Sequence, residues 1–186
     1  SGWNWFSANL TNGDRDTTQS VLGSLSPVYR DHIKDLYFSA VYYDGSGWRG
    51  SLEKMMLTSA YKISLINADT LKVSGSPVNP QTPIELLAGW NWIGYLPQGP
   101  MPINEALGTI TASAGDQIKT QTKHATFDSS GWVATGGLDS MSPGEGYMLK
   151  VAVESNLTYP ISSSDTSSVL GRRVLSLEEA PALPSS

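Results

Sequence analysis

The sequence contains no cysteine among its 186 residues. A disulfide framework, a thiolate metal site and a cysteine nucleophile are therefore excluded. Long hydrophobic runs are missing as well, because no apolar stretch approaches the ~20 residues that a membrane-spanning helix needs. The sequence thus predicts that the chain does not insert into a membrane.

Charged residues are scarce, and the basic ones are dispersed. Asp, Glu, Lys and Arg make up 16% of the chain, and the net charge is −5. In an average soluble domain about a quarter of the residues are charged. Nucleic acids and anionic membrane surfaces bind concentrated Lys and Arg. Since no basic run occurs, neither is an expected partner.

The residues needed for catalysis are also few. Only two histidines occur, His32 and His124, and the sequence has no Gly-x-Ser-x-Gly run that would carry a nucleophilic serine. Acidic residues that recur, such as Asp31 and Asp116, fall at expected strand ends or turns, where they hold the backbone. Residues 12–16 offer oxygen ligands without the spacing of a calcium loop. We therefore predict no catalytic residues, no metal ion and no cofactor.

Two stretches of the chain are nearly identical. Gly2-Trp3-Asn4-Trp5 opens the sequence, and Gly89-Trp90-Asn91-Trp92 opens its second part. Further matches follow in the same order and at a nearly constant displacement: Leu22/Leu107, Asp31/Asp116, Asp44/Asp128, Trp48/Trp132, Tyr61/Tyr147 and Leu71/Leu157. A constant order at a nearly constant displacement predicts an internal tandem duplication.

Alternating hydrophobicity and glycine-rich turns predict a mostly β fold. We expect two tandem β-rich repeats with one short helix each, packed with pseudo-twofold symmetry. Residues 1–75 form the first repeat, 76–88 a connection and lead-in strand, 89–161 the second repeat, and 162–186 a linker-like tail. The expected helices span residues 17–25 and 103–110, with Thr17 or Thr18 as the cap of the first.

The two copies differ at their start. Residues 84–88 lead into the second Gly-Trp-Asn-Trp, whereas the first copy has no such lead-in, which indicates a piece of a longer multidomain chain. Residues 169–177 are expected to add an edge strand. Whether the tail after Ser162 supplies the missing lead-in strand is left open by the sequence.

The succession of Gly-Trp-Asn, a Leu-Gly-Ser-Leu turn, Gly-Ser-Gly-Trp and Pro143-Gly144-Glu145-Gly146-Tyr147 resembles a repeat of secreted, multidomain bacterial proteins. In that family a Gly-Trp-Asn strand opens the unit and a Pro-Gly-x-Gly-Tyr strand closes it. The resemblance covers residues 1 to about 160 and implies no particular activity. The first copy departs from the pattern at residues 57–61, where it reads Leu-Thr-Ser-Ala-Tyr.

A second resemblance concerns the C-terminal ten residues. Residues 177–186 resemble the segment that precedes the C-terminal sorting domain of type IX secretion substrates. This resemblance implies export to the surface or medium of a Bacteroidetes-like bacterium.

Aromatic residues give the strongest functional signal, because all six tryptophans are duplicated. Trp3 and Trp90 are expected to anchor the core. Trp5 and Trp92 are either an enlarged core or a local specialisation, and Trp48 with Trp132 follows a hairpin tip, where we expect exposure. The predicted ligand-binding residues are Trp48, Trp132, Trp5, Trp92, Tyr42, Tyr43 and Tyr95.

Exposed Trp and Tyr faces are suited to sugar rings and other flat, half-apolar ligands. We therefore expect a non-catalytic carbohydrate-binding module of a larger secreted or surface protein, with a polysaccharide as its partner. The alternative is a structural or adhesive spacer without a small ligand, and a glycan-active enzyme domain comes third. A binder exposes aromatic side chains in a line or groove, whereas a spacer buries all six tryptophans.

Overall fold

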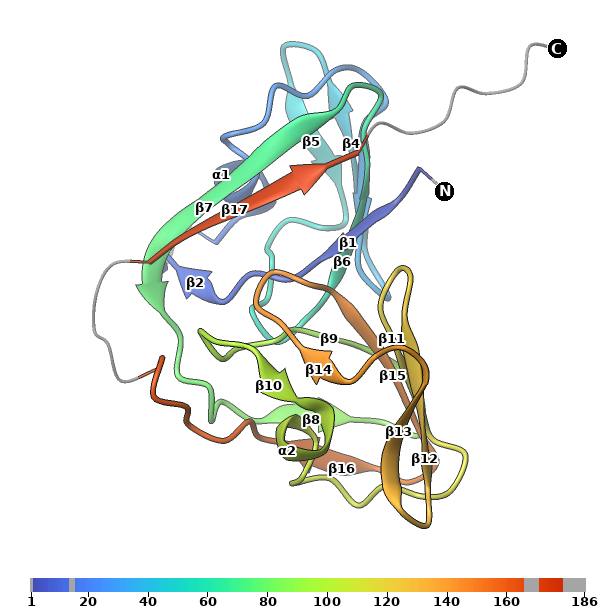
Figure 1. The fold of residues 1–186 in the computed structure, drawn as a ribbon. Coiled ribbons are helices and arrows are strands. Elements are labelled where there is room, and N and C mark those ends of the chain that lie inside the picture. Colours follow the sequence, from blue (N-terminus) through green and yellow to red (C-terminus); the bar gives the residue numbers. More distant parts are fainter. Residues whose placement is uncertain (1, 14–15, 166–170, 179–186) are drawn as a thin grey trace, which may run out of the picture.

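The structure, a computed structural model, describes residues 2–13, 16–165 and 171–178. It is mostly β, as predicted (Figure 1). The first half contains β1 (Asn4–Phe6), β2 (Leu10–Thr11), α1 (Thr18–Val21), β3 (His32–Lys34), β4 (Ser39–Tyr43), β5 (Gly47–Gly50), β6 (Tyr61–Ser64) and β7 (Asp69–Pro77). The second contains β8 (Ile84–Leu86), β9 (Gly89–Ile93), β10 (Met101–Pro102), α2 (Ile103–Ala106), β11 (Gln117–Lys119), β12 (His124–Asp128), β13 (Gly131–Gly136), β14 (Ser140–Met141), β15 (Tyr147–Val151) and β16 (Ser155–Leu157). The last strand is β17 (Gly171–Leu177).

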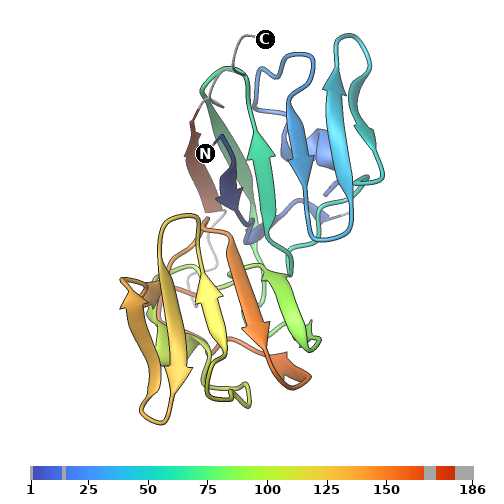
Figure 2. The same ribbon diagram turned by 90° about the vertical axis from the view of Figure 1, so that its right-hand side faces the viewer.

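Each half builds one five-stranded antiparallel sheet, and the two sheets have the same strand order. The first runs β1-β6-β3-β4-β5, and the second runs β9-β15-β11-β12-β13. Figure 2 shows the sheets one above the other, with the order reversed from left to right, as a twofold rotation requires. The residues matched in the sequence therefore occupy equivalent strands.

Each sheet covers its own hydrophobic core. Ile33 and Ile63 lie on neighbouring strands of the first sheet and are fully buried, as are Ile118 and Leu149 in the second. Strand residues on either side of these positions are partly exposed, because successive side chains point to opposite faces of a sheet. The inner faces thus form two separate cores, one in each half.

The recurring aspartates hold the turns before the third strand of each sheet. Asp31 is buried and accepts backbone hydrogen bonds from Val28 and Ile66. Asp116 is buried in the same way and accepts from the backbone N–H groups of Ser113 and Ala152. A buried carboxylate needs such donors, so both side chains are engaged in structure.

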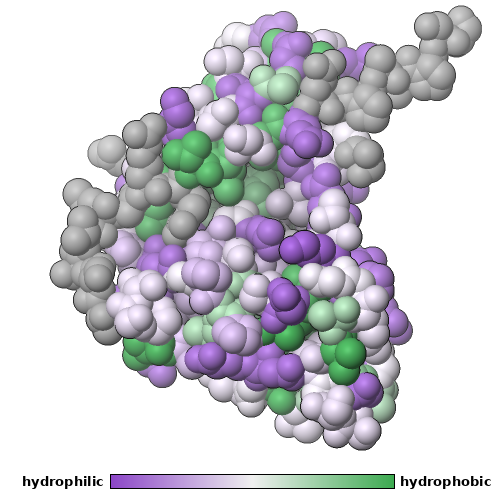
Figure 3. Space-filling model, viewed as in Figure 1, coloured by the Kyte–Doolittle hydropathy of each residue, from purple (hydrophilic) through white to green (hydrophobic). Residues whose placement is uncertain are grey.

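The two helices are shorter than the sequence predicts. Each spans four residues, and Thr17 caps α1 by accepting a hydrogen bond from the Ser20 backbone N–H, 3.1 Å away. A single turn has too few internal hydrogen bonds to persist without packing. Neither helix of the described residues is long and apolar enough to cross a bilayer. On the face shown in Figure 3, hydrophobic residues form separate groups between polar ones.

The tail supplies a strand that the first half would otherwise lack. β17 pairs with β7 from Gly171–Gly75 to Leu177–Asp69. In the second half the strand equivalent to β7 is β16, and β16 pairs with β8. β17 therefore takes the place in the first half that the lead-in strand β8 takes in the second. Residues 166–170 and 179–186 are not among the described ones, so most of the segment resembling the sorting-domain junction lies outside the described part of the chain.

The asparagine of each Gly-Trp-Asn-Trp stretch fixes the end of this lead-in strand. Asn4 donates from Nδ2 to the Glu178 carbonyl oxygen and accepts from the Glu178 N–H, both at 2.9 Å. Asn91 makes the same pair of bonds with Leu87, at 2.8 and 3.0 Å. Both asparagines are buried, so the motif is a polar clamp inside the fold.

Reciprocal backbone hydrogen bonds join the two halves. The Ser7 N–H donates to the Gly144 carbonyl oxygen at 3.1 Å, and the Gly94 N–H donates to the Thr58 carbonyl oxygen at 2.9 Å. Gly94 corresponds to Ser7, and Thr58 corresponds to Gly144. Each half thus gives the same two segments to the joint, as expected for a twofold, self-complementary contact.

Candidate functional site

The expected exposure of Trp48 and Trp132 is wrong. Their side chains are 8% and 5% exposed. In each hairpin the indole turns inward and packs in the core of its own half. The backbone N–H of Trp48 donates to Gln19, and that of Trp132 donates to Asn104. A ligand cannot reach these two rings in the folded protein.

The predicted tyrosines have three different environments. Tyr95 is fully buried, and its hydroxyl donates to the Gly99 carbonyl oxygen at 2.8 Å, so it cannot contact a ligand. Tyr42 is half-buried and packs edge-on against Trp48, with ring centroids 5.6 Å apart. Tyr43 is exposed beside Tyr29. Of the three, Tyr43 alone presents a large free surface.

Trp3 and Trp90 do not anchor the core, so the expectation that they do is wrong. Both are half-buried on the outer faces of their sheets. The ammonium nitrogen of Lys34 lies 4.7 Å from the Trp3 ring centroid, and that of Lys119 lies 4.3 Å from the Trp90 centroid. The inward positions on these strands belong to Asn4 and Asn91, so alternation places the tryptophans outside.

Trp5 and Trp92 meet at the joint between the halves. The Lys62 ammonium nitrogen lies 3.8 Å from the Trp5 ring centroid and 4.4 Å from the Trp92 ring centroid. One ammonium group therefore contacts an indole from each half. We call the following residues the Trp–Lys cluster: Trp3, Trp5, Trp90, Trp92, Lys34, Lys62 and Lys119.

The lysines of this cluster were not predicted from the sequence. Lys34 and Lys119 are matched between the two copies, which is a usable signal, whereas Lys62 corresponds to Met148. Lys62 lies directly opposite Trp5 on one neighbouring strand and opposite Lys34 on the other. In the second sheet Met148 takes this position between Trp92 and Lys119.

Positive charge is concentrated around Lys62. Its pKa is lowered from the ordinary 10.5 to about 8 by partial burial and by the neighbouring Lys34 and Lys119. Like charges directly opposite in a sheet repel each other. None of the three lysines forms an ion pair with a described carboxylate, and no acidic side chain contributes to the Lys62 shift.

Lys62 is expected to titrate near pH 8, which NMR of its side-chain resonances would measure. Because its pKa is lower in the folded than in the unfolded chain, its contribution to stability rises with pH between about 8 and 10.5. Replacing Lys34 with methionine removes one repelling charge and is expected to raise the Lys62 pKa. An unchanged pKa in that variant would contradict the assigned repulsion.

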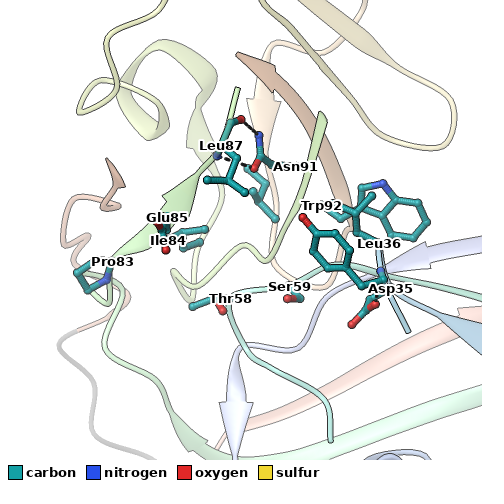
Figure 4. A pocket seen from close by; sticks show the side chains of 12 residues that line it. Asp35, Leu36, Thr58, Ser59, Pro83, Ile84, Glu85, Leu87, Asn91 and Trp92 are labelled. Atoms are coloured by element: carbon teal, nitrogen blue, oxygen red, sulfur yellow. Dashed lines mark hydrogen bonds between the residues drawn. The ribbon is translucent and has the colours of Figure 1, made fainter. Parts of the chain in front are cut away.

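Two cavities of about 370 Å³ flank the cluster, and each contains one tryptophan of the central pair. Trp92 borders the first, together with Leu36 of the β3–β4 turn and Glu85 of the lead-in strand (Figure 4). Trp5 borders the second, with Gln121 of the β11–β12 turn and Val174 of β17. Each cavity therefore combines equivalent elements of both halves.

One polar atom at this site has no hydrogen-bond partner among the described residues. The indole Nε1 of Trp92 is buried without an acceptor. Buried donors in native structures are nearly always paired, so an exception marks a place that merits a functional explanation. Within the described part of the chain, no three His, Asp or Glu side chains gather as a metal site.

No family model matches the sequence, and no curated protein and no solved structure is significantly similar to it. The resemblance to the Gly-Trp-Asn repeat therefore stays a prediction. The Trp–Lys cluster and its two cavities are the features of the described residues that point to a function.

Proposed function

We propose that this protein is a non-catalytic module that binds polysaccharide, as part of a larger protein secreted by a bacterium or held at its surface. The observation that carries the proposal is the pair of half-buried indoles, Trp5 and Trp92, which meet at one ammonium group and each border a cavity. Rings of this kind give sugars an apolar surface, and the cavity walls add polar groups for their hydroxyls.

The twofold arrangement suits a polymer. We propose that the halves arose by internal duplication, which is supported by their equal strand order and by the matched bonds of Asn4 and Asn91. Duplication yields two similar cavities on either side of one aromatic pair. Weak contacts in the two cavities would then act together on a single chain of sugars.

The spacer alternative draws support from the burial of Trp48 and Trp132. It predicts that all six tryptophans are inaccessible. The four tryptophans of the Trp–Lys cluster are only half-buried. A spacer does not require indoles and lysines gathered at its surface. We therefore favour the binding module over the spacer, and both over a glycan-active enzyme.

Replacing both Trp5 and Trp92 with alanine is expected to weaken polysaccharide binding by about tenfold or more, since burying one large apolar side chain contributes about 1.5–3 kcal/mol. Affinity electrophoresis against a panel of plant and algal polysaccharides would measure the loss. Tyr29→Ala, which removes an exposed aromatic ring outside the cluster and outside the predicted ligand-binding residues, serves as the control and should bind normally. Full binding by the folded double variant would refute the site.

Tryptophan fluorescence offers an independent measurement on the unmodified protein. Acrylamide is expected to quench part of the emission, from the four half-buried indoles, and a bound polysaccharide should protect that part. If acrylamide quenches none of the tryptophan emission even without a ligand, and no polysaccharide of the panel binds, the spacer would be favoured.

A further inference from the structure

The Trp–Lys cluster concentrates positive charge in a chain that is acidic overall. The net charge is −5, yet three lysines converge at the joint between the halves. Lys34 and Lys62 are direct neighbours across β3 and β6. Lys119 comes from the other half, and its charge also acts on Lys62. The fold thus brings cations from both repeats to one place.

This arrangement is unfavourable for the protein alone. Cation–π contacts with Trp5 and Trp92 partly offset the repulsion, but no described carboxylate is paired with the three ammonium groups. Protein surfaces ordinarily intersperse charges of opposite sign. Unfavourable interactions that persist in a fold concentrate at functional sites, where a ligand compensates for them.

The position of Lys62 also restricts how a sugar can bind. Its ammonium group occupies the ring faces that Trp5 and Trp92 turn toward it. A neutral sugar cannot stack on those faces without displacing a cation. A ligand that carries an anionic group can instead pair with Lys62, whose ammonium has three hydrogen-bond donors, while its apolar C–H groups contact the indoles.

We propose that the ligand is an anionic polysaccharide, whose carboxylate or sulfate groups pair with Lys34, Lys62 and Lys119 while its sugar rings contact Trp5 and Trp92. This inference rests on the proposed function and names the chemical class of the ligand. Both cavities contain acidic side chains, Asp35 and Glu85 in one and Glu145 and Glu178 in the other. The anionic groups therefore belong at the lysines, and uncharged hydroxyls belong in the cavities.

The test compares charged polysaccharides with neutral polymers of related structure. Polygalacturonate should bind at least about tenfold more tightly than its methyl-esterified form, since hydrogen bonds to charged groups are roughly twice as strong as neutral ones. A sulfated galactan such as carrageenan, set against neutral agarose, distinguishes sulfate from carboxylate as the recognised group. Affinity for the preferred polyanion should fall as salt rises, because surface charges are screened.

A variant taken from the protein itself tests the central residue. Lys62→Met copies Met148, the residue at the equivalent position of the second sheet. It should lower affinity for the polyanion by about tenfold without weakening any binding of the neutral polymer, because the indole faces are then free of the cation. Lys72→Met, on β7 and outside the cluster, removes the same charge from an exposed position and should bind like the unmodified protein.

The outcomes separate this inference from the proposed function. Equal binding of charged and neutral polymers, or full polyanion binding by Lys62→Met, overturns the anionic ligand but leaves a polysaccharide-binding module. No binding to any polysaccharide overturns both. Bases also stack on aromatic rings beside cations, so single-stranded oligothymidylate is included. Tighter binding of this oligonucleotide than of every polysaccharide overturns both as well.

Discussion

Replacing Gly94 with alanine is expected to destabilise the protein by about 3 kcal/mol, near the upper end of overpacking substitutions. A Cβ atom at this position would meet the carbonyl oxygen of Leu57, well inside van der Waals contact, and would also crowd that of Ser59. Both are backbone atoms, so no side-chain rotation relieves the clash. The Gly94 N–H would then lose its hydrogen bond to Thr58 across the joint.

Urea denaturation measures the loss, with Gly108→Ala as the matched control. A Cβ at Gly108 would approach its nearest atoms, two backbone oxygens, only to 3.3 Å. Its cost should be about 1 kcal/mol or less, because alanine also restricts the unfolded chain. Equal destabilisation by the two variants would show that close approach at the joint is not what requires glycine at position 94.

The same substitution links stability to the candidate site. Trp92 lies on the same strand segment, just before Gly94, and its carbonyl oxygen accepts a hydrogen bond from the Ala60 N–H across the joint. Displacing this segment moves Trp92 relative to Lys62 and Trp5. Gly94→Ala should therefore weaken polysaccharide binding even under conditions where the protein remains folded.

The β pattern could be predicted closely where local sequence controls it. Residues 39–43 and the turn at residues 44–47 predict a strand that ends at Tyr43, and β4 has those bounds in the structure. The helical spacing of Val21, Leu22 and Leu25 predicts a helix over residues 17–25, but α1 ends at Val21 after one turn. Helix ends depend on tertiary packing that the spacing does not encode.

The roles of the tryptophans could not be predicted, for a definite physical reason. Alternation predicts that Trp3 and Trp5 lie on one face of the first strand segment and Asn4 on the other, but it does not say which face is inward. The resemblance to the Gly-Trp-Asn repeat favours the tryptophan before the asparagine as the core residue, whereas the buried residue is Asn4, whose amide needs the backbone of residue 178 as its partner. A contact between residues 174 positions apart leaves no local trace in the sequence.

Lys62 illustrates a second limit of sequence analysis. Its two aromatic neighbours lie far from it along the chain. Trp5 reaches it through the pairing of β1 with β6, and Trp92 on β9 reaches it only across the joint between the halves. Comparison of the repeats draws attention to shared residues, such as Lys34 and Lys119. It does not draw attention to a position where the two copies differ, and Lys62, the residue proposed to recognise the charged ligand, stands at such a position.

Removing residues 171–186 is expected to unfold the first half while the second remains folded. β17 covers Leu71, which is fully buried, and contributes Leu177, which is 4% exposed. Emptying one buried leucine site typically costs about 2–5 kcal/mol. Asn4 would also lose both bonds to Glu178 and remain unpaired in the core. The combined loss approaches the total stability of a small domain, about 5–15 kcal/mol.

Hydrogen exchange resolves this prediction by strand. In the truncated chain the amides of β6 and β7 should exchange much faster, whereas those of β11 and β15 should keep their protection, because β8 still closes the second half. Adding a synthetic peptide of residues 171–186 should restore protection in β7 by pairing along the same register. If β7 stays protected without the peptide, the first half folds without β17. If protection is lost equally in both halves, the two sheets form one cooperative unit, and the joint at Gly94 is what couples them.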